Sequence, residues 1–114
     1  MIAVIFEVLP AQGQRDAYFE WAAKLRASLD DIDGFISIER YQSLADNQRI
    51  LSLSFWRDEA AVAQWRAREM HRAAQSAGRA HVFADYRLRV AAVVRDYGLR
   101  ERAEAPADSV ALHG

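Results

Sequence analysis

The order in which strand-like and helix-like patterns alternate along this chain most restricts its fold. A nearly continuous apolar run over residues 2–9 ends at Pro10 and predicts a strand covered on both faces. The later patterns are a helix over 15–30, strands over 35–42 and 49–56, a helix from Glu59, and a strand over 86–97. This β-α-β-β-α-β order predicts an α+β, ferredoxin-like split βαβ fold, with both helices on one face of an antiparallel sheet.

Alternation within the two middle strands predicts which side chains lie under the helices. We assign to the helix-covered face the apolar side chains Ile36, Ile38, Leu51, Leu53 and Phe55. The opposite face carries Ser37, Glu39, Ser52 and Ser54 together with Phe35, Tyr41, Ile50 and Trp56. It is more aromatic than a solvated sheet face usually is, so we predict that a second copy of the chain covers it. The product is a dimeric α+β barrel, and a monomer with this face exposed is the alternative.

The two helical segments have apolar stripes at helical spacing. The first stripe consists of Tyr18, Trp21, Ala22, Leu25 and Leu29. In the second segment Asp58 is the predicted N-cap, and Val62 and Trp65 lie on the inward side. A later stripe is rotated about the axis, which predicts a kink over 69–72 and a short further segment ending at Gly78.

Size and charge exclude several classes of function. The 114 residues form one predicted domain over 1–98 and a C-terminal extension over 99–114. A formal net charge of −1 gives no electrostatic footprint for nucleic acid or an anionic membrane. Cysteine is absent, which removes disulfides and thiolate chemistry and fits a reducing compartment. The N-terminus has neither a signal-peptide pattern nor a membrane span, so we expect a cytoplasmic protein.

No metal, nucleotide or activated-serine motif is visible in the sequence. His71, His81 and His113 do not lie at ligand spacing from one another. We therefore predict no metal and no bound cofactor, and a pocket with one base and aromatic walls. The candidate catalytic residues are His71 as general base and Trp65 as pocket wall and N–H donor. The candidate substrate-binding residues are Phe6, Tyr18, Phe55 and Gln75.

Each candidate also has a purely structural interpretation. Trp65 equally suits core filling, as do Phe6 and Phe55. His71 also suits a solvated or capping histidine, which is the commoner role of such a residue, with Gln75 one helical turn beyond it. The sequence by itself leaves both interpretations open.

Four segments carry a resemblance to a known family: 34–39, 55–65, 69–75 and the strand that begins at Asp85. Together they resemble the antibiotic biosynthesis monooxygenase (ABM) domain over about residues 1–98. The resemblance implies a homodimer with a cleft between helices and sheet in each subunit. It implies oxidation of a small aromatic hydroxylated compound by molecular oxygen, without metal, flavin or haem. Trp65 and His71 match positions often found in the second helix of the family.

Two other functions remain open within that resemblance. A haem-degrading branch has a first-strand Asn, a second-helix Trp and a His ten residues later. Trp65 fits, but this chain has Phe6 or Glu7 at the first position and Gln75 at the last, which argues against haem degradation of that type. Haem ligation by His71 in another pose stays open. A non-catalytic ligand-binding dimer is the third function, and it predicts a cleft filled by Trp21, Trp65, Phe6 and Phe55.

Overall fold

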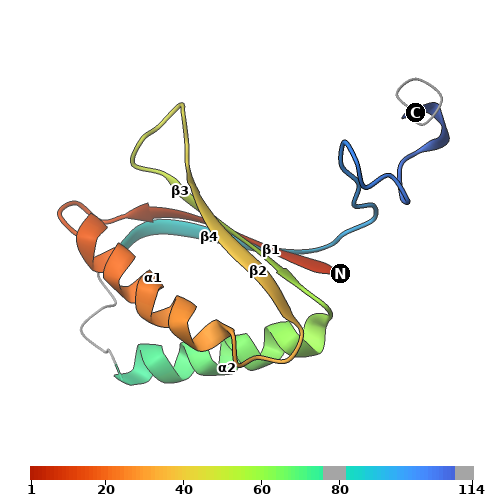
Figure 1. Ribbon diagram of the computed structural model, residues 1–114. Coiled ribbons are helices and arrows are strands. Elements are labelled where there is room, and N and C mark those ends of the chain that lie inside the picture. Colours follow the sequence, from red (N-terminus) through yellow and green to blue (C-terminus); the bar gives the residue numbers. More distant parts are fainter. Residues whose placement is uncertain (76–81, 110–114) are drawn as a thin grey trace.

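The computed structural model contains six elements in the predicted order (Figure 1). They are β1 (Ile2–Pro10), α1 (Arg15–Leu29), β2 (Phe35–Gln42), β3 (Ile50–Trp56), α2 (Glu59–Gln75) and β4 (Phe83–Ala92). The structure describes residues 1–75 and 82–109, and over 69–75 it describes the helical backbone alone. The strands form one antiparallel sheet in the order β2-β3-β1-β4, and both helices lie on the same side of it. The predicted α+β, ferredoxin-like fold is therefore confirmed.

The helices cover the sheet face that the sequence pattern assigned to the outside. In β3, Ile50, Ser52, Ser54 and Trp56 are buried, whereas the three residues between them are half-buried on the open face. Burial of Trp56 favours this orientation of β3, because an aromatic ring of this size gains more free energy from complete burial than a leucine does. Its indole Nε1 donates to Ser54 Oγ over 2.9 Å, so the ring is buried without losing a hydrogen bond. The prediction that Leu51, Leu53 and Phe55 lie under the helices was wrong.

A register shift in β2 corrects a second face assignment. The pairing of β2 with β3 is irregular between Phe35 and Ser37, where β2 has an extra residue. Phe35 and Ile38 both pack against the core, while Ile36 is 52% exposed. Ile36 and Ile38 were predicted to share one face, and the irregularity separates them because it breaks the strict period of two.

Two boundaries also differ from the sequence prediction. β4 occupies 83–92 rather than 86–97, because it pairs with β1 along its whole length. Its last residue, Ala92, lies opposite Ile2, the first residue of β1. α2 continues through 69–72 without the predicted kink, since no Pro or Gly interrupts residues 59–75. Gly78 and the predicted short segment lie outside the described residues.

Asp58 holds the N-terminus of α2, as predicted. Its Oδ1 accepts a hydrogen bond of 3.0 Å from the backbone N–H of Ala61, which is an N-cap contact. Arg57 donates to the other carboxylate oxygen over 2.9 Å. These bonds, that from Arg57 first, hold the pKa of Asp58 below its ordinary value.

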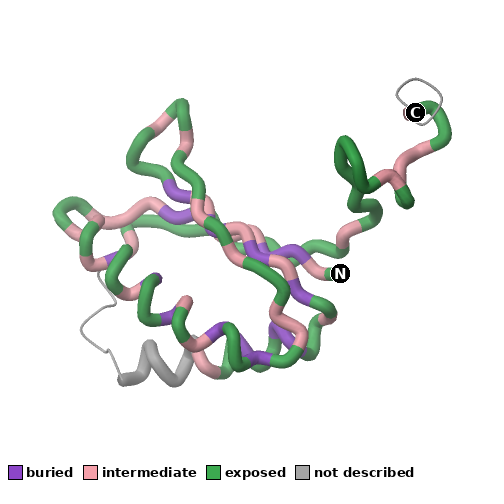
Figure 2. The backbone as a smooth tube through the Cα atoms, viewed as in Figure 1, coloured by how far each residue is buried: buried purple, intermediate pink, exposed green. Residues whose placement is uncertain are grey.

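Figure 2 shows buried segments both on the strands of the sheet and on the helices that cover it. The buried apolar residues form two clusters, of which the larger consists of Val4, Leu25, Leu29, Ile32, Trp56, Ala61, Val62 and Trp65. The smaller cluster consists of Val8, Tyr18, Ala22, Ile50 and Val82. On β3 the two clusters are separated by Ser52 and Ser54, which are buried but small and polar. A uniformly apolar core would have apolar side chains at these two positions. This part of the interior is instead polar and less filled.

After β4 the chain leaves the sheet (Figure 1). Val93 N donates to Met1 O over 3.0 Å, and beyond it Arg102 joins residues of the tail to one another. The Arg102 guanidinium donates to Gly98 O and Ser109 Oγ over 3.1 and 2.8 Å. The division into a domain over 1–98 and an extension over 99–114 stays a prediction. No helix in the described part of the chain is long and apolar enough to cross a membrane.

Candidate functional site

A small pocket lies between the two core clusters, beside Trp21, which packs against both of them. Its volume is about 20 Å³, enough for about one water molecule. It is enclosed by β1, β2 and β3 below and by α1 and α2 above. The lining residues are Val4, Phe6, Tyr18, Trp21, Leu25, Ile38, Arg40, Ser52, Ser54 and Trp65.

Strand register brings the polar residues of the sheet to this point. Arg40 of β2 pairs with Ser52 of β3, which pairs with Phe6 of β1, so the three form one row across the sheet. The next row on the same face places Ser54 between Ile38 and Val4. Ser52 is 7% exposed and Ser54 is 4% exposed. Because serine is small, the row leaves space beside the long Arg40 side chain.

Aromatic rings form one wall of the pocket. Tyr18 is 1% exposed, and its ring centroid lies 6.3 Å from that of Trp21 and 6.0 Å from that of Phe83. Phe6 also contacts Phe83, edge to face, with centroids 5.9 Å apart. Such edge contacts are the preferred geometry of aromatic pairs. The wall therefore suits a flat or apolar occupant.

Two buried donors in the pocket wall have no hydrogen-bond partner within the described structure. They are Trp65 Nε1, on a side chain that is 7% exposed, and Arg40 Nε. Trp56 provides the contrast, since its Nε1 donates to Ser54. An unsatisfied buried donor costs about 1–3 kcal/mol, so two in one pocket mark it as a place for acceptor atoms.

Tyr18 adds a hydroxyl to the same pocket. Burial raises the pKa of Tyr18 above its ordinary value, and the nearby Arg40 guanidinium offsets part of this effect. The hydroxyl therefore stays protonated near neutral pH and is available as a donor. The only charge among the described lining residues is that of Arg40, and it is positive.

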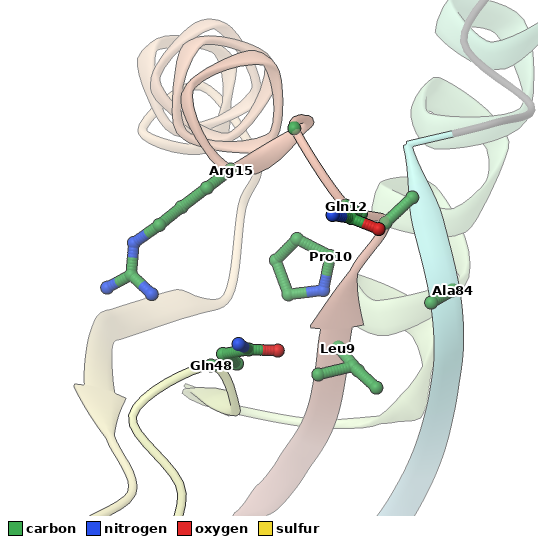
Figure 3. A pocket seen from close by; sticks show the side chains of 8 residues that line it. Leu9, Pro10, Gln12, Arg15, Gln48 and Ala84 are labelled. Atoms are coloured by element: carbon green, nitrogen blue, oxygen red, sulfur yellow. The ribbon is translucent and has the colours of Figure 1, made fainter.

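A larger cavity lies at the edge of the molecule, and fewer of its lining side chains could bind or react with a ligand (Figure 3). It measures about 510 Å³ between the end of β1, the start of α1 and the β2–β3 loop. Arg15 is the ionisable residue among its described lining residues, and its guanidinium already donates to Asn47 O over 2.9 Å. Figure 3 shows Pro10 and Leu9 facing the uncharged Gln12 and Gln48. The interior pocket is therefore the better candidate site.

The pocket brings together three of the six residues that the sequence nominated. Trp65, Phe6 and Tyr18 all line it. Phe55 does not, because it lies on the open face of the sheet, paired with Ala3 and Ser37. The side chains of His71 and Gln75 lie outside the described residues. Within the described residues, no group of three or more His, Cys, Asp or Glu side chains is placed to hold a metal ion.

Sequence reasoning missed Arg40, Ser52 and Ser54, and it assigned Trp21 to the core. The signal for the serines was their alternation with Ile50 and Trp56, which would have marked them as polar residues on a buried face. Arg40 gave no signal, because a single arginine in a strand resembles a solvated charge.

Comparisons with known proteins agree with this architecture. Residues 1–77 match the model of the family described as antibiotic biosynthesis monooxygenase. A Pyricularia oryzae protein named Jasmonate monooxygenase ABM is 50% identical over 93 residues, which are 82% of this chain and 43% of that protein. The uncharacterized protein YqjZ of Bacillus subtilis is 32% identical over 93 residues, which are 82% of this chain and 79% of YqjZ. The present chain thus spans less than half the length of the Pyricularia protein.

A solved structure supports the fold independently. Rv0793 from Mycobacterium tuberculosis superposes with a TM-score of 0.71 at 18% identity, over 85% of this chain and 98% of that one. At that identity the likeness concerns the fold alone.

Proposed function

Because this chain belongs to the antibiotic biosynthesis monooxygenase family, we propose that it is a monooxygenase whose active site is the interior pocket. The observation that carries the proposal is the pair of unpartnered donors, Trp65 Nε1 and Arg40 Nε, behind a wall of aromatic rings. The relative named for jasmonate oxygenation is half identical to this chain over the shared segment.

The proposed reaction is cofactor-independent oxidation of a small aromatic hydroxylated compound by molecular oxygen. A base removes a proton from the substrate, and the resulting anion reduces oxygen. For a substrate with a CH₂ group between aromatic rings, one oxygen atom becomes the new carbonyl and the other leaves as water. A hydroquinone instead loses two electrons and two protons and gives hydrogen peroxide. Both reactions balance without a further reductant.

The pocket residues have distinct parts in this reaction. The N–H of Trp65 stabilises the developing oxyanion or peroxide, because a preorganised donor is most effective where charge develops. The aromatic wall excludes water, which strengthens this contact. His71 is the proposed general base on sequence grounds, since its side chain lies outside the described residues.

Removing the Trp65 donor is expected to slow the reaction. Trp65→Phe keeps an aromatic ring but deletes the N–H, and we expect kcat for oxygen uptake to fall about 100-fold, as for other oxyanion donors. The measurement is oxygen consumption by metal-free protein with a panel of anthrones, hydroquinones and catechols. His71→Ala in the same assay tests the base. The control is Phe19→Leu, an aromatic change on α1 at a residue that is 37% exposed.

The outcomes separate the enzyme from its residue assignments. Uptake unchanged in Trp65→Phe contradicts the role of this donor, and uptake that survives His71→Ala contradicts the base. Uptake no greater than the non-enzymatic background across the whole panel contradicts the proposed oxidation of aromatic hydroxylated compounds.

We also propose that a second copy of the chain covers the open face of the sheet. The half-buried Leu51, Leu53 and Phe55 lie on that face, and Tyr41 beside them is 46% exposed. Sedimentation equilibrium is expected to give twice the chain mass of 12.9 kDa. Leu53→Lys should shift the protein to the monomer, whereas Lys24→Gln on α1 should not. A wild-type mass of 12.9 kDa at tens of micromolar protein contradicts the dimer.

A further inference from the structure

We propose that Arg40 binds an anionic group of the occupant, so that this pocket selects small apolar carboxylates over their neutral counterparts. The inference rests on the proposed function for the identity of the site. To that function it adds the residue that recognises the charged end of a small carboxylate such as jasmonate, the compound in the name of the Pyricularia relative.

The first support is the contrast between Arg40 and two arginines that have carboxylate partners. Arg57 pairs with Asp33 and Asp58 over 3.2 and 2.9 Å, and Arg89 pairs with Glu7 over 2.9 Å. In the described part of the chain Arg40 has no carboxylate partner; its guanidinium interacts with the Tyr18 side chain, and its Nε is buried without an acceptor. A partly buried charge is stable only when an opposite charge or strong acceptors compensate for lost hydration. An anionic ligand supplies both.

The second support is the shape of the donor set. A guanidinium offers Nε–H and an Nη–H in a fork that matches the two oxygens of a carboxylate. Tyr18, whose hydroxyl stays protonated, and Trp65 add donors to the same pocket. No Asp or Glu is among the described lining residues, so nothing there opposes an anion.

The third support is the separation of polar and apolar parts. Arg40 and Ser52 lie at the β2 end of one strand row, and Phe6 continues this row on β1. Phe6 belongs to the aromatic wall. A ligand with an acidic group at one end and a flat apolar body at the other fits both parts at once.

Binding requires the pocket to widen, because 20 Å³ holds about one water molecule. Phe6, Trp21 and Arg40 are half-buried rather than fully buried, so we expect these side chains to move apart when a ligand enters. Two indole rings, those of Trp21 and Trp65, line the pocket. Ligand entry should therefore change tryptophan fluorescence, which supplies a readout that does not depend on catalysis.

The test compares acids with their neutral esters. The probes are jasmonic acid and its methyl ester, and 1-hydroxy-2-naphthoic acid and its methyl ester, titrated by tryptophan fluorescence. In the wild-type protein we expect at least one acid to bind about 10- to 100-fold more tightly than its ester, the range for a hydrogen bond to a charged group. Arg40→Met should reduce acid binding to the level of the ester, and Arg40→Lys should restore part of it. Arg49→Met, which alters an arginine paired with Asp46 on the β2–β3 loop, is the control.

Two results overturn the inference: acids and esters that bind the wild-type protein equally well, or an Arg40→Met variant that loses both equally while retaining its melting temperature. Oxygen uptake separates this inference from the proposed function. Arg40-dependent acid binding without any oxygen uptake supports the anion site and rejects the oxygenase. Oxygen uptake from neutral substrates, with no preference for acids, supports the oxygenase and rejects the anion site.

Discussion

Trp56→Ala is expected to lower the free energy of unfolding by about 3–5 kcal/mol. The side chain is 0% exposed, and its ring centroid lies 5.1 Å from Phe35 and 5.9 Å from Trp65. Truncation leaves a cavity in the larger cluster and removes the donor to Ser54 Oγ. Since domains of this size are stable by only about 5–15 kcal/mol, this loss removes a large fraction of the total stability.

Urea denaturation followed by far-ultraviolet circular dichroism measures this loss as a fall in the transition midpoint. Phe19→Ala is the matched control, because it removes an aromatic ring that is 37% exposed rather than buried. A Trp56→Ala midpoint no lower than that of the control contradicts the assignment of Trp56 to the core. It would also restore the face assignment that the sequence pattern favoured.

Ser52→Val is expected to separate stability from activity. Valine adds apolar volume next to the cavity and suits a strand, so the free energy of unfolding should rise by about 0.5–1 kcal/mol. The added methyl groups occupy the space beside Arg40 and Phe6, its neighbours in the strand row. Acid binding and oxygen uptake should therefore fall about 100-fold, equivalent to about 2.7 kcal/mol. A substitution that raises stability and lowers activity is typical of a functional site.

Ser54→Val supplies the contrast for that experiment. Ser54 Oγ accepts the hydrogen bond from Trp56 Nε1, so its loss leaves a buried donor unsatisfied and should destabilise the protein by about 1–3 kcal/mol. Denaturation and fluorescence titration on both variants give the comparison. Ser52→Val that binds the acids as well as the wild-type protein would mean that the occupant lies elsewhere. Equal stability changes in the two variants would contradict the different roles assigned to the serines.

The element order was readable from the sequence because it depends on local patterns. The stripe through Tyr18, Leu25 and Leu29 is buried as expected, and Asp58 caps α2. These features need only neighbours along the chain, so periodicity and side-chain chemistry suffice to identify them.

The sheet faces were not readable in the same way. Leu51, Leu53 and Phe55 are collectively more hydrophobic than the opposite set, yet complete burial of Trp56 outweighs them, and only the tertiary structure allows that burial. The irregularity after Phe35 has no local signature. Both errors, the exchanged faces of β3 and the unrecognised irregularity in β2, affected the prediction of the site. As a result Phe55 was predicted to bind substrate and Arg40 was not. Trp65 was identified because its position depends on helix periodicity alone.

The gap between the two core clusters has a consequence for how this protein can change over generations. The larger cluster is formed without Arg40 and Ser52, and the smaller one is too. Substitutions at these two positions therefore leave most of the folding energy intact while altering what the interior accepts. During evolution, single substitutions at these positions can therefore change the substrate while each variant still folds. Arg40 and Ser52 are for the same reason suitable positions to randomise in directed evolution.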